Sequence, residues 1–178
     1  MQLSRYTRSD AGVQRAAPAL REVIGMKRSW YGNLASGAAG AVALTAVHEL
    51  GRKRLSYAPR MDVLGMRALR RWIPGLGDER PRSTRLRRWA LAGDLIANTI
   101  YYAAVPSTSR RATWTRAAAL GLSAGAGALL LPQPMGLGDA PHAERRANQA
   151  MTMAWYVAGA LATAMAANLT GHGRRVRA

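Results

Sequence analysis

Residues 147–173 read ANQAMTMAWYVAGALATAMAANLTGHG and contain no charged side chain apart from the usually neutral His172. Three further windows are nearly as poor in charge, although 20% of the chain is charged: residues 29–47 and 117–138 carry none, and residues 89–109 carry only Asp94. A helix needs about 20 mainly apolar residues to cross a bilayer, and it satisfies its backbone polar groups internally. The windows also lack the period-2 alternation of a barrel strand. The sequence therefore predicts an all-α integral membrane protein, a bundle of four transmembrane helices.

The alternative to this prediction is a soluble, alanine-rich helical bundle. The mean hydropathy of the chain is only −0.13, and the windows are rich in Ala and Gly rather than Leu and Ile, so each window inserts with little driving force. Helices of a soluble bundle need charged residues along their outer faces, however, and the windows offer none. The absence of charge therefore favours the membrane interpretation.

Four spans are predicted within one transmembrane domain of residues 29–173. They cover residues 30–49, 89–106, 116–131 and 149–170. A basic leader, residues 1–28, precedes this domain, and a basic tail, residues 174–178, follows it.

The connection between the first two spans, residues 51–88, is the most cationic part of the chain, with 12 basic and 3 acidic residues. Within it, Met61–Ile73 is predicted to form a short amphipathic helix on the membrane surface, ended by Pro74. The apolar arc of this surface helix contains Met61, Leu64, Met66, Ala68, Leu69, Trp72 and Ile73, while Arg67, Arg70 and Arg71 gather on the opposite side. The arginines are expected to contact anionic lipid headgroups. The alternative is a helix packed on a soluble partner.

The chain is expected in a bacterial cytoplasmic (inner) membrane, as a multi-pass protein. Arg greatly outnumbers Lys and Ala is abundant, which is typical of GC-rich bacterial genomes. Basic residues are almost balanced between the two sides of the predicted topology. Their concentration beside two span ends favours a cytoplasmic location for the 51–88 connection, although this arrangement translocates six basic residues of the leader.

The composition also bears on partners and cofactors. A formal charge of +17 in a soluble protein would point to nucleic acid, but the charge lies outside the four windows, so no specific nucleic acid is predicted. The chain has no Cys, which excludes thiolate nucleophiles, iron–sulfur clusters and Cys-based zinc sites. With three His residues and no His-Glu metalloprotease motif, no metal site and no cofactor are predicted.

Asp94 is the first candidate for function, because it is the one formal charge well inside a window and an acid at that depth is costly unless it is paired or faces water. Asn98 and Tyr101 follow it at helical spacing, so the second span carries a polar stripe that is not expected to face lipid. Two interpretations are open: a hydrogen-bond network between helices, and a site for an ion, a proton or a substrate.

A second polar seam follows the first span. The small and polar residues Asn33, Gly37, Ala41, Thr45 and His48 step along one side of the helix and end beside Glu49. The two seams are expected to face each other. His48 and Glu49 lie next to a basic cluster at the span end. They are interpreted either as an interfacial ion-pair cap or as a proton-relay or ligand site.

Small residues are expected to let the helices pack tightly. The predicted packing glycines are Gly37, Gly40, Gly121, Gly125 and Gly159. Residues 121–125 also match the G-x-S-x-G pattern of hydrolases, but the match lies inside a predicted helix without a preceding strand. A hydrolase using Ser123 and His48 is therefore a minor alternative, and no catalytic residues are predicted.

The sequence thus favours a small polytopic membrane protein in which the two polar seams meet inside the bundle. Such a protein would bind a small solute or ion, or pass one as an oligomer. The alternatives are a membrane-embedded enzyme and an accessory subunit of a membrane complex. The expected partners are the lipid bilayer with its anionic headgroups, and a second copy of the chain or a partner membrane subunit.

Overall fold

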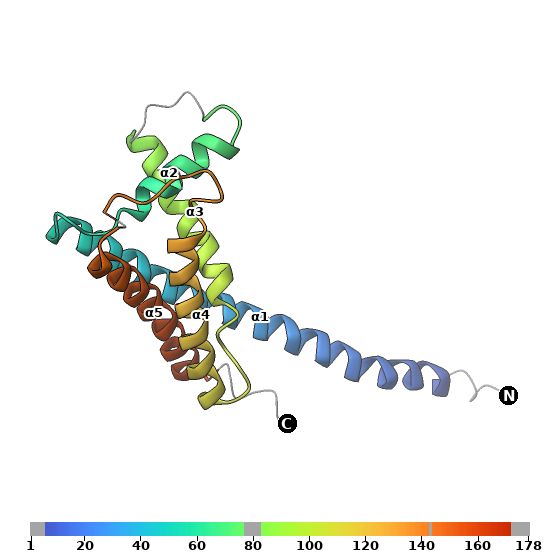
Figure 1. Ribbon diagram of the computed structural model, residues 1–178. Helices are drawn as coiled ribbons and strands as arrows, with labels where there is room; N and C mark the ends of the chain where they lie inside the picture. Colours follow the sequence, from blue (N-terminus) through green and yellow to red (C-terminus); the bar gives the residue numbers. More distant parts are fainter. Residues whose placement is uncertain (1–5, 77–82, 143, 172–178) are drawn as a thin grey trace. The chain divides into compact units, whose positions relative to one another are not determined.

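The computed structural model describes residues 6–76, 83–142 and 144–171, with side chains from residue 30 onward. The described residues form five α-helices and no strand. The helices are α1 (Tyr6–Arg54), α2 (Met61–Trp72), α3 (Thr84–Tyr102), α4 (Arg110–Leu130) and α5 (Arg146–Leu169) (Figure 1). The all-helical prediction is therefore confirmed for the described residues. The four predicted spans fall in α1, α3, α4 and α5, although α3 ends at Tyr102 rather than at Pro106.

The chain divides into two compact units, Met1–Gly32 and Asn33–Ala178, and the boundary lies inside α1. In the first unit α1 begins at Tyr6, so the helix includes most of the residues predicted as a basic leader. The second unit contains the rest of α1 together with α2 to α5, and the contacts described below all belong to it. The predicted basic tail, residues 174–178, lies outside the described residues.

Serine residues cap the N-termini of α3 and α4. The hydroxyl of Ser83 accepts a hydrogen bond from the backbone N–H of Leu86 at 3.1 Å. The hydroxyl of Ser109 accepts one from the backbone N–H of Ala112, also at 3.1 Å. Each cap satisfies one of the backbone donors that a helix start leaves unpaired, so both helix starts are locally specified.

Helix α1 approaches α3 and α5 at glycines. A Cβ added to Gly37 would meet backbone atoms of α3, the carbonyl oxygen of Thr99 and, at 2.8 Å, the nitrogen of Ala103. A Cβ added to Gly40 would lie 2.5 Å from the carbonyl oxygen of Gly159 in α5. These crossings have no room for a methyl group because backbone meets backbone.

Helices α4 and α5 cross in the same way. A Cβ on Gly121 would lie 2.7 Å from Cα of Val157, and one on Gly125 would lie 3.0 Å from Cα of Met153. All five glycines predicted to pack thus lie where two helices approach closely. One buried cluster joins α1, α3, α4 and α5 and contains Leu44, Tyr102, Val105, Ala117, Tyr156, Ala160 and Ala164.

The amphipathic helix predicted between the first two spans exists as α2, so this part of the prediction is confirmed. Its predicted contact with the membrane surface needs correction, because Leu64 and Met66 of the predicted lipid-facing arc are buried. With Val63 also buried, α2 packs on Leu86 and Ala90 of α3. Only the C-terminal end of the arc is open, where Trp72 is 51% and Ile73 is 45% exposed. Packing on α3 removes the apolar face of α2 from water within the chain itself.

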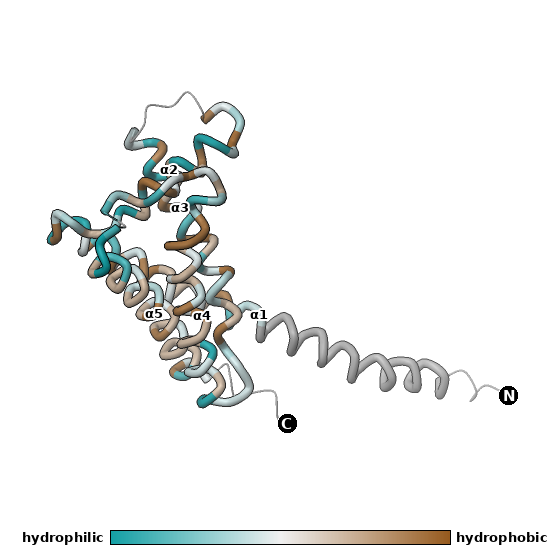
Figure 2. Tube along the Cα trace, viewed as in Figure 1, coloured by the Kyte–Doolittle hydropathy of each residue, from teal (hydrophilic) through white to brown (hydrophobic). Residues whose placement is uncertain are grey.

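Among the described residues, one helix, α5, is long and apolar enough to cross a membrane by length and composition. One such helix is weak evidence for membrane association, because the core helix of a soluble protein passes the same test. Figure 2 shows the hydrophilic residues in teal gathered around α2 and near helix ends, while the middle of α4 and α5 is pale to brown.

Candidate ligand-binding cavity

A cavity of about 210 Å³ lies at the end of the second unit where α1 ends and α3 begins. Its walls come from α1, α2, α3 and α5, and from the end of α4 with the loop that follows. The polar residues that line it are Thr45, His48, Glu49, Arg52, Asp62, Asp94 and Tyr156. The cavity is several times larger than the roughly 30 Å³ that one water occupies in the liquid.

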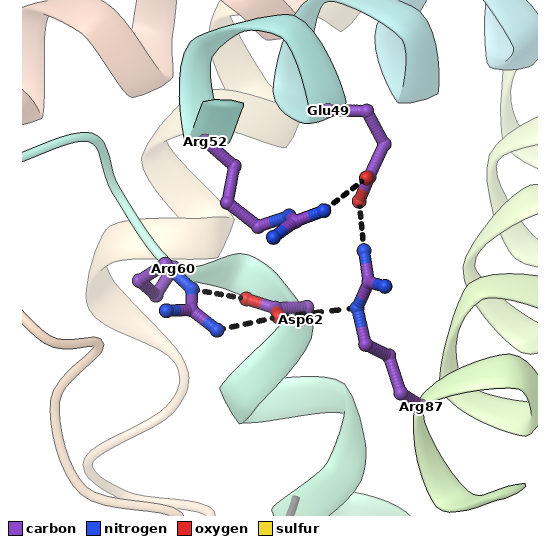
Figure 3. Close-up of polar contacts among 5 residues, drawn as sticks. All are labelled: Glu49, Arg52, Arg60, Asp62 and Arg87. Atoms are coloured by element: carbon purple, nitrogen blue, oxygen red, sulfur yellow. Dashed lines mark hydrogen bonds and ion pairs between the residues drawn. The ribbon is translucent and has the colours of Figure 1, made fainter. Parts of the chain in front are cut away.

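Glu49 at the end of α1 is held by two arginines on one side of the cavity (Figure 3). Arg52, one turn further along α1, donates to Oε2 of Glu49 at 2.8 Å. Arg87 of α3 donates to Oε1 at 2.6 Å. The pair with Arg52 is the ion-pair cap that the sequence suggested, while the pair with Arg87 joins α1 to α3.

Asp62 in the first turn of α2 completes this ion-pair network. Its carboxylate, 7% exposed, accepts two hydrogen bonds from Arg60 at 2.8 and 2.9 Å, and one of its oxygens lies 3.6 Å from Nε of Arg87. Burial would raise the pKa of Asp62, but the hydrogen bonds from Arg60 and the surrounding guanidinium charges outweigh burial, so this pKa lies below its usual value. Arg87 therefore reaches acids on both α1 and α2.

The lowered pKa of Asp62 predicts a dependence of stability on pH. A carboxyl whose pKa is lower in the folded chain stabilises the fold above its unfolded pKa, and this contribution is lost as the pH falls through the folded value. We expect the free energy of unfolding in mild detergent to fall below about pH 4, the range in which an ordinary Asp takes up a proton. Asp62→Asn should reduce this fall, as measured by circular dichroism during denaturant titrations. Glu144→Gln, at an exposed acid, should keep the wild-type profile; an equal loss of the pH dependence in both variants would contradict the assignment to Asp62.

Asp94 lines the other part of the cavity and has a different environment. Its Oδ1 accepts a hydrogen bond from the side-chain amide of Asn98, one turn further along α3, at 2.9 Å. Among the described residues no basic side chain forms an ion pair with Asp94. A carboxylate at a cavity without a cation from the protein is the least compensated charge of this region.

Three other lining side chains carry buried polar atoms without a partner. They are Oγ1 of Thr45, Nε2 of His48 and Nε of Arg52, and only one further atom of this kind occurs among the described residues. The imidazole of His48 is held edge-on against Trp155 and Tyr156, with ring centroids 5.0 and 5.7 Å apart. Because buried polar groups in proteins almost always have a hydrogen-bond partner, these three atoms carry an unusual desolvation cost in the protein beside the cavity.

The structure brings together four of the seven polar residues singled out from the sequence, since Thr45, His48, Glu49 and Asp94 line the cavity. Asn98 is not part of the lining, but its side-chain amide donates a hydrogen bond to Asp94. Asn33 and Tyr101 are not part of the lining.

Tyr101 instead faces α4. Its hydroxyl donates to the carbonyl oxygen of Leu120 at 3.1 Å and lies 2.8 Å from the hydroxyl of Ser123. Ser123 also donates to the carbonyl oxygen of Leu120. The G-x-S-x-G match therefore takes part in helix contacts, and no contact joins Ser123 to His48 in the described residues.

Sequence reasoning did not find Asp62, Arg60 and Arg87 as members of this site. Arg87 lies 38 residues from Glu49, and no local pattern relates the two. Asp62 lies in the first turn of α2, where the helix dipole favours an acid, and this favourable position gives no sign of a contact with α3.

The arginines predicted for the membrane surface line a second, shallow hollow beside the loop that follows α4. Arg67 donates to the backbone oxygens of Leu137 and Asp139 at 2.9 and 2.8 Å. The guanidinium of Arg71 lies beside Gly136, and Arg70 lines the same shallow hollow. Trp72 follows these arginines at the exposed end of the helix.

Within the described ranges, no group of three or more acidic or His side chains is arranged to hold a metal ion. Comparison of the chain with protein-family models, with curated proteins and with solved structures finds no match.

Proposed function

We propose that this chain is a bacterial inner-membrane protein in which α1, α3, α4 and α5 cross the bilayer and a small solute is bound in the cavity at one end of the bundle. Passage of that solute across the membrane would need self-association, because the glycine crossings bring the helices too close together to enclose a path within one chain.

One observation carries the membrane part of this proposal. Every exposed position in residues 33–50, 89–102, 117–130 and 147–169 has an uncharged side chain. Large apolar side chains on these outer faces are Val42, Leu50, Trp89, Ile96, Ile100, Leu122, Leu130, Leu161, Met165 and Leu169. Isolated exposed apolar residues are ordinary in soluble proteins, but uncharged outer faces on four neighbouring helices are those expected toward lipid.

The solute-binding part rests on the cavity, whose lining combines apolar walls with the polar side chains of Thr45, His48 and Asp94. Asp94 and the network of Glu49 and Asp62 also lie at the end of the bundle, near the basic connection, where polar groups meet water or headgroups at low cost.

The exposed end of α2 supports a peripheral lipid contact beside the cavity. Trp72 and Ile73 are exposed next to Arg71, so an apolar tip and a cationic group are available to the same headgroup layer. This contact is smaller than a helix lying flat, because the rest of the apolar face is covered by α3.

Single-cysteine labelling tests the topology, since the chain has no Cys of its own. The two labelling positions are Thr108→Cys, in the link between α3 and α4, and Glu144→Cys, before α5. A membrane-impermeant maleimide should label one of them in spheroplasts and the other in inverted vesicles, because four crossings place them on opposite sides of the membrane. A protein crossing only with α5 would place both positions on the same side. Labelling of both from one side, or recovery of the chain as soluble protein, would contradict the four crossings.

Leu91→Cys tests the cavity as a solute site. Leu91 lines the cavity one turn before Asp94. The small neutral reagent methyl methanethiosulfonate should modify this Cys in the folded protein, as followed by mass spectrometry. Modification only after denaturation in SDS would show that the cavity is closed to solutes, and the proposed binding function would fail.

A further inference from the structure

Two of the three acids that line the cavity have arginine partners, and the third, Asp94, has none among the described residues. Glu49 and Asp62 are each bound by arginines. Arg52, the one Arg or Lys among the described lining residues, already donates to Glu49. Asp94 alone has only an uncharged partner, Asn98. A ligand that enters the cavity therefore gains most by bringing a positive charge to Asp94.

Asp94 by itself offers a metal ion few ligands. A protein site that holds a hard cation without its water shell supplies six or more oxygen ligands. No other acid of the described residues is grouped with Asp94 in a way that could complete such a set. A cation that carries its own hydrogen-bond donors needs a single carboxylate, so an ammonium group fits better.

The other lining residues indicate the size and polarity of the rest of the ligand. Apolar side chains, among them Leu64, Ala68, Leu91 and Ala128, make up much of the walls. The volume of about 210 Å³ is below that of pockets for drug-sized molecules, which begin at roughly 300 Å³. Thr45, His48 and Tyr156 add polar side chains to the lining, and these suit one further polar group on the ligand.

From this juxtaposition we infer that the cavity binds a small organic ammonium ion, with its charge paired to Asp94 and its apolar body against α2, α3 and α4. This inference rests on the proposed solute-binding function and adds the class of ligand to it.

Three probes that share one apolar skeleton test the charge: 2-phenylethylammonium, 2-phenylethanol and 3-phenylpropionate. Each is added to the purified Leu91→Cys protein in mild detergent, and the rate of modification by methyl methanethiosulfonate is measured. We expect the ammonium to halve the rate at a concentration at least tenfold lower than the alcohol, and the carboxylate to protect least. Asp94→Asn in the same background should remove the advantage of the ammonium, whereas the matched control Asp139→Asn, at an exposed acid outside the lining, should keep it.

Equal protection by the three probes, no protection by any of them, or an unchanged preference in Asp94→Asn would each overturn the ammonium assignment. If the neutral reagent still modifies Leu91→Cys in the folded protein, the cavity remains accessible to solutes. The proposed solute-binding function is then retained, and only the assignment of an ammonium ligand fails. Denaturant titration of Asp94→Asn beside the control shows whether a lost preference reflects the charge or a loss of folding.

Discussion

Gly37→Ala is expected to lower the free energy of unfolding by about 1–3 kcal/mol, the usual cost of overpacking a close contact. The added methyl group would meet the backbone of α3 at Thr99 and Ala103, and a backbone cannot rotate away as a flexible side chain can. Helices α1 and α3 would have to separate. The loss should appear as earlier unfolding in an SDS titration of the protein in mild detergent, followed by far-ultraviolet circular dichroism.

Gly93→Ala is the matched control for this change. Gly93 also lies in a helix, but an added Cβ would have no neighbour within 4 Å. Because Ala favours the helix by up to about 1 kcal/mol over Gly, this variant should be as stable as the wild type or more stable. Equal effects of the two substitutions would mean that the α1–α3 crossing is looser than the structure has it.

Arg87→Met is expected to cost about 1.5–3 kcal/mol, the range for a hydrogen bond to a charged group. Arg87 donates to Glu49 of α1 and lies beside Asp62 of α2. Its loss therefore removes the one side chain that, among the described residues, is paired with acids on both helices. Methionine keeps much of the apolar length of the side chain. The same SDS titration measures the loss, and modification of Leu91→Cys should become faster as the cavity wall loosens.

Arg88→Met separates this effect from a general change in charge. Arg88 is the next residue, is exposed, and makes no ion pair among the described residues. Its replacement should change the free energy of unfolding by less than about 0.5 kcal/mol, as is usual for exposed positions. A similar loss in both variants would show that net charge, not the contacts of Arg87, stabilises the bundle.

The helices were predictable because their signals are local. Charge is absent over whole windows, Ser83 and Ser109 stand at helix starts, and Pro132 follows α4. The sequence placed the end of α3 too far along the chain, because the window without further charges continues to Pro106 and beyond. The residue before a proline disfavours the α conformation, and the chain leaves the helix a turn earlier, at Tyr102.

The partner of α2 was not predictable from its own sequence. A helical wheel identifies an apolar face, but lipid, another protein and α3 all cover such a face equally well. Val63 stood apart from the predicted arc as an apolar residue among arginines, and its burial shows that the covered face is rotated toward it. Leu86 and Ala90, which complete the contact, lie beyond Pro74 and Pro81 in the sequence, so their relation to α2 is purely tertiary.

Only part of the candidate site was predictable, because some of its members have local sequence signals and others are brought in by tertiary contacts. His48, Glu49 and Asp94 stood out because acids and His are rare in apolar windows. Arg87 belongs to a stretch rich in arginine, and nothing in the sequence distinguishes it from Arg88. Only the folded chain shows that one of them turns toward Glu49 and the other toward the outside.

The packing of α2 against α3 has a consequence for substitutions in α3. Leu86 and Ala90 cover the apolar face of α2 around Val63 and Met66, so a polar side chain at either position would leave part of that face uncovered. An uncovered cationic amphipathic helix is the type of segment that binds at a headgroup layer. Helix α2 would then exchange its contact with α3 for the lipid surface, so the same helix sequence is compatible with both contacts and the side chains of α3 decide between them.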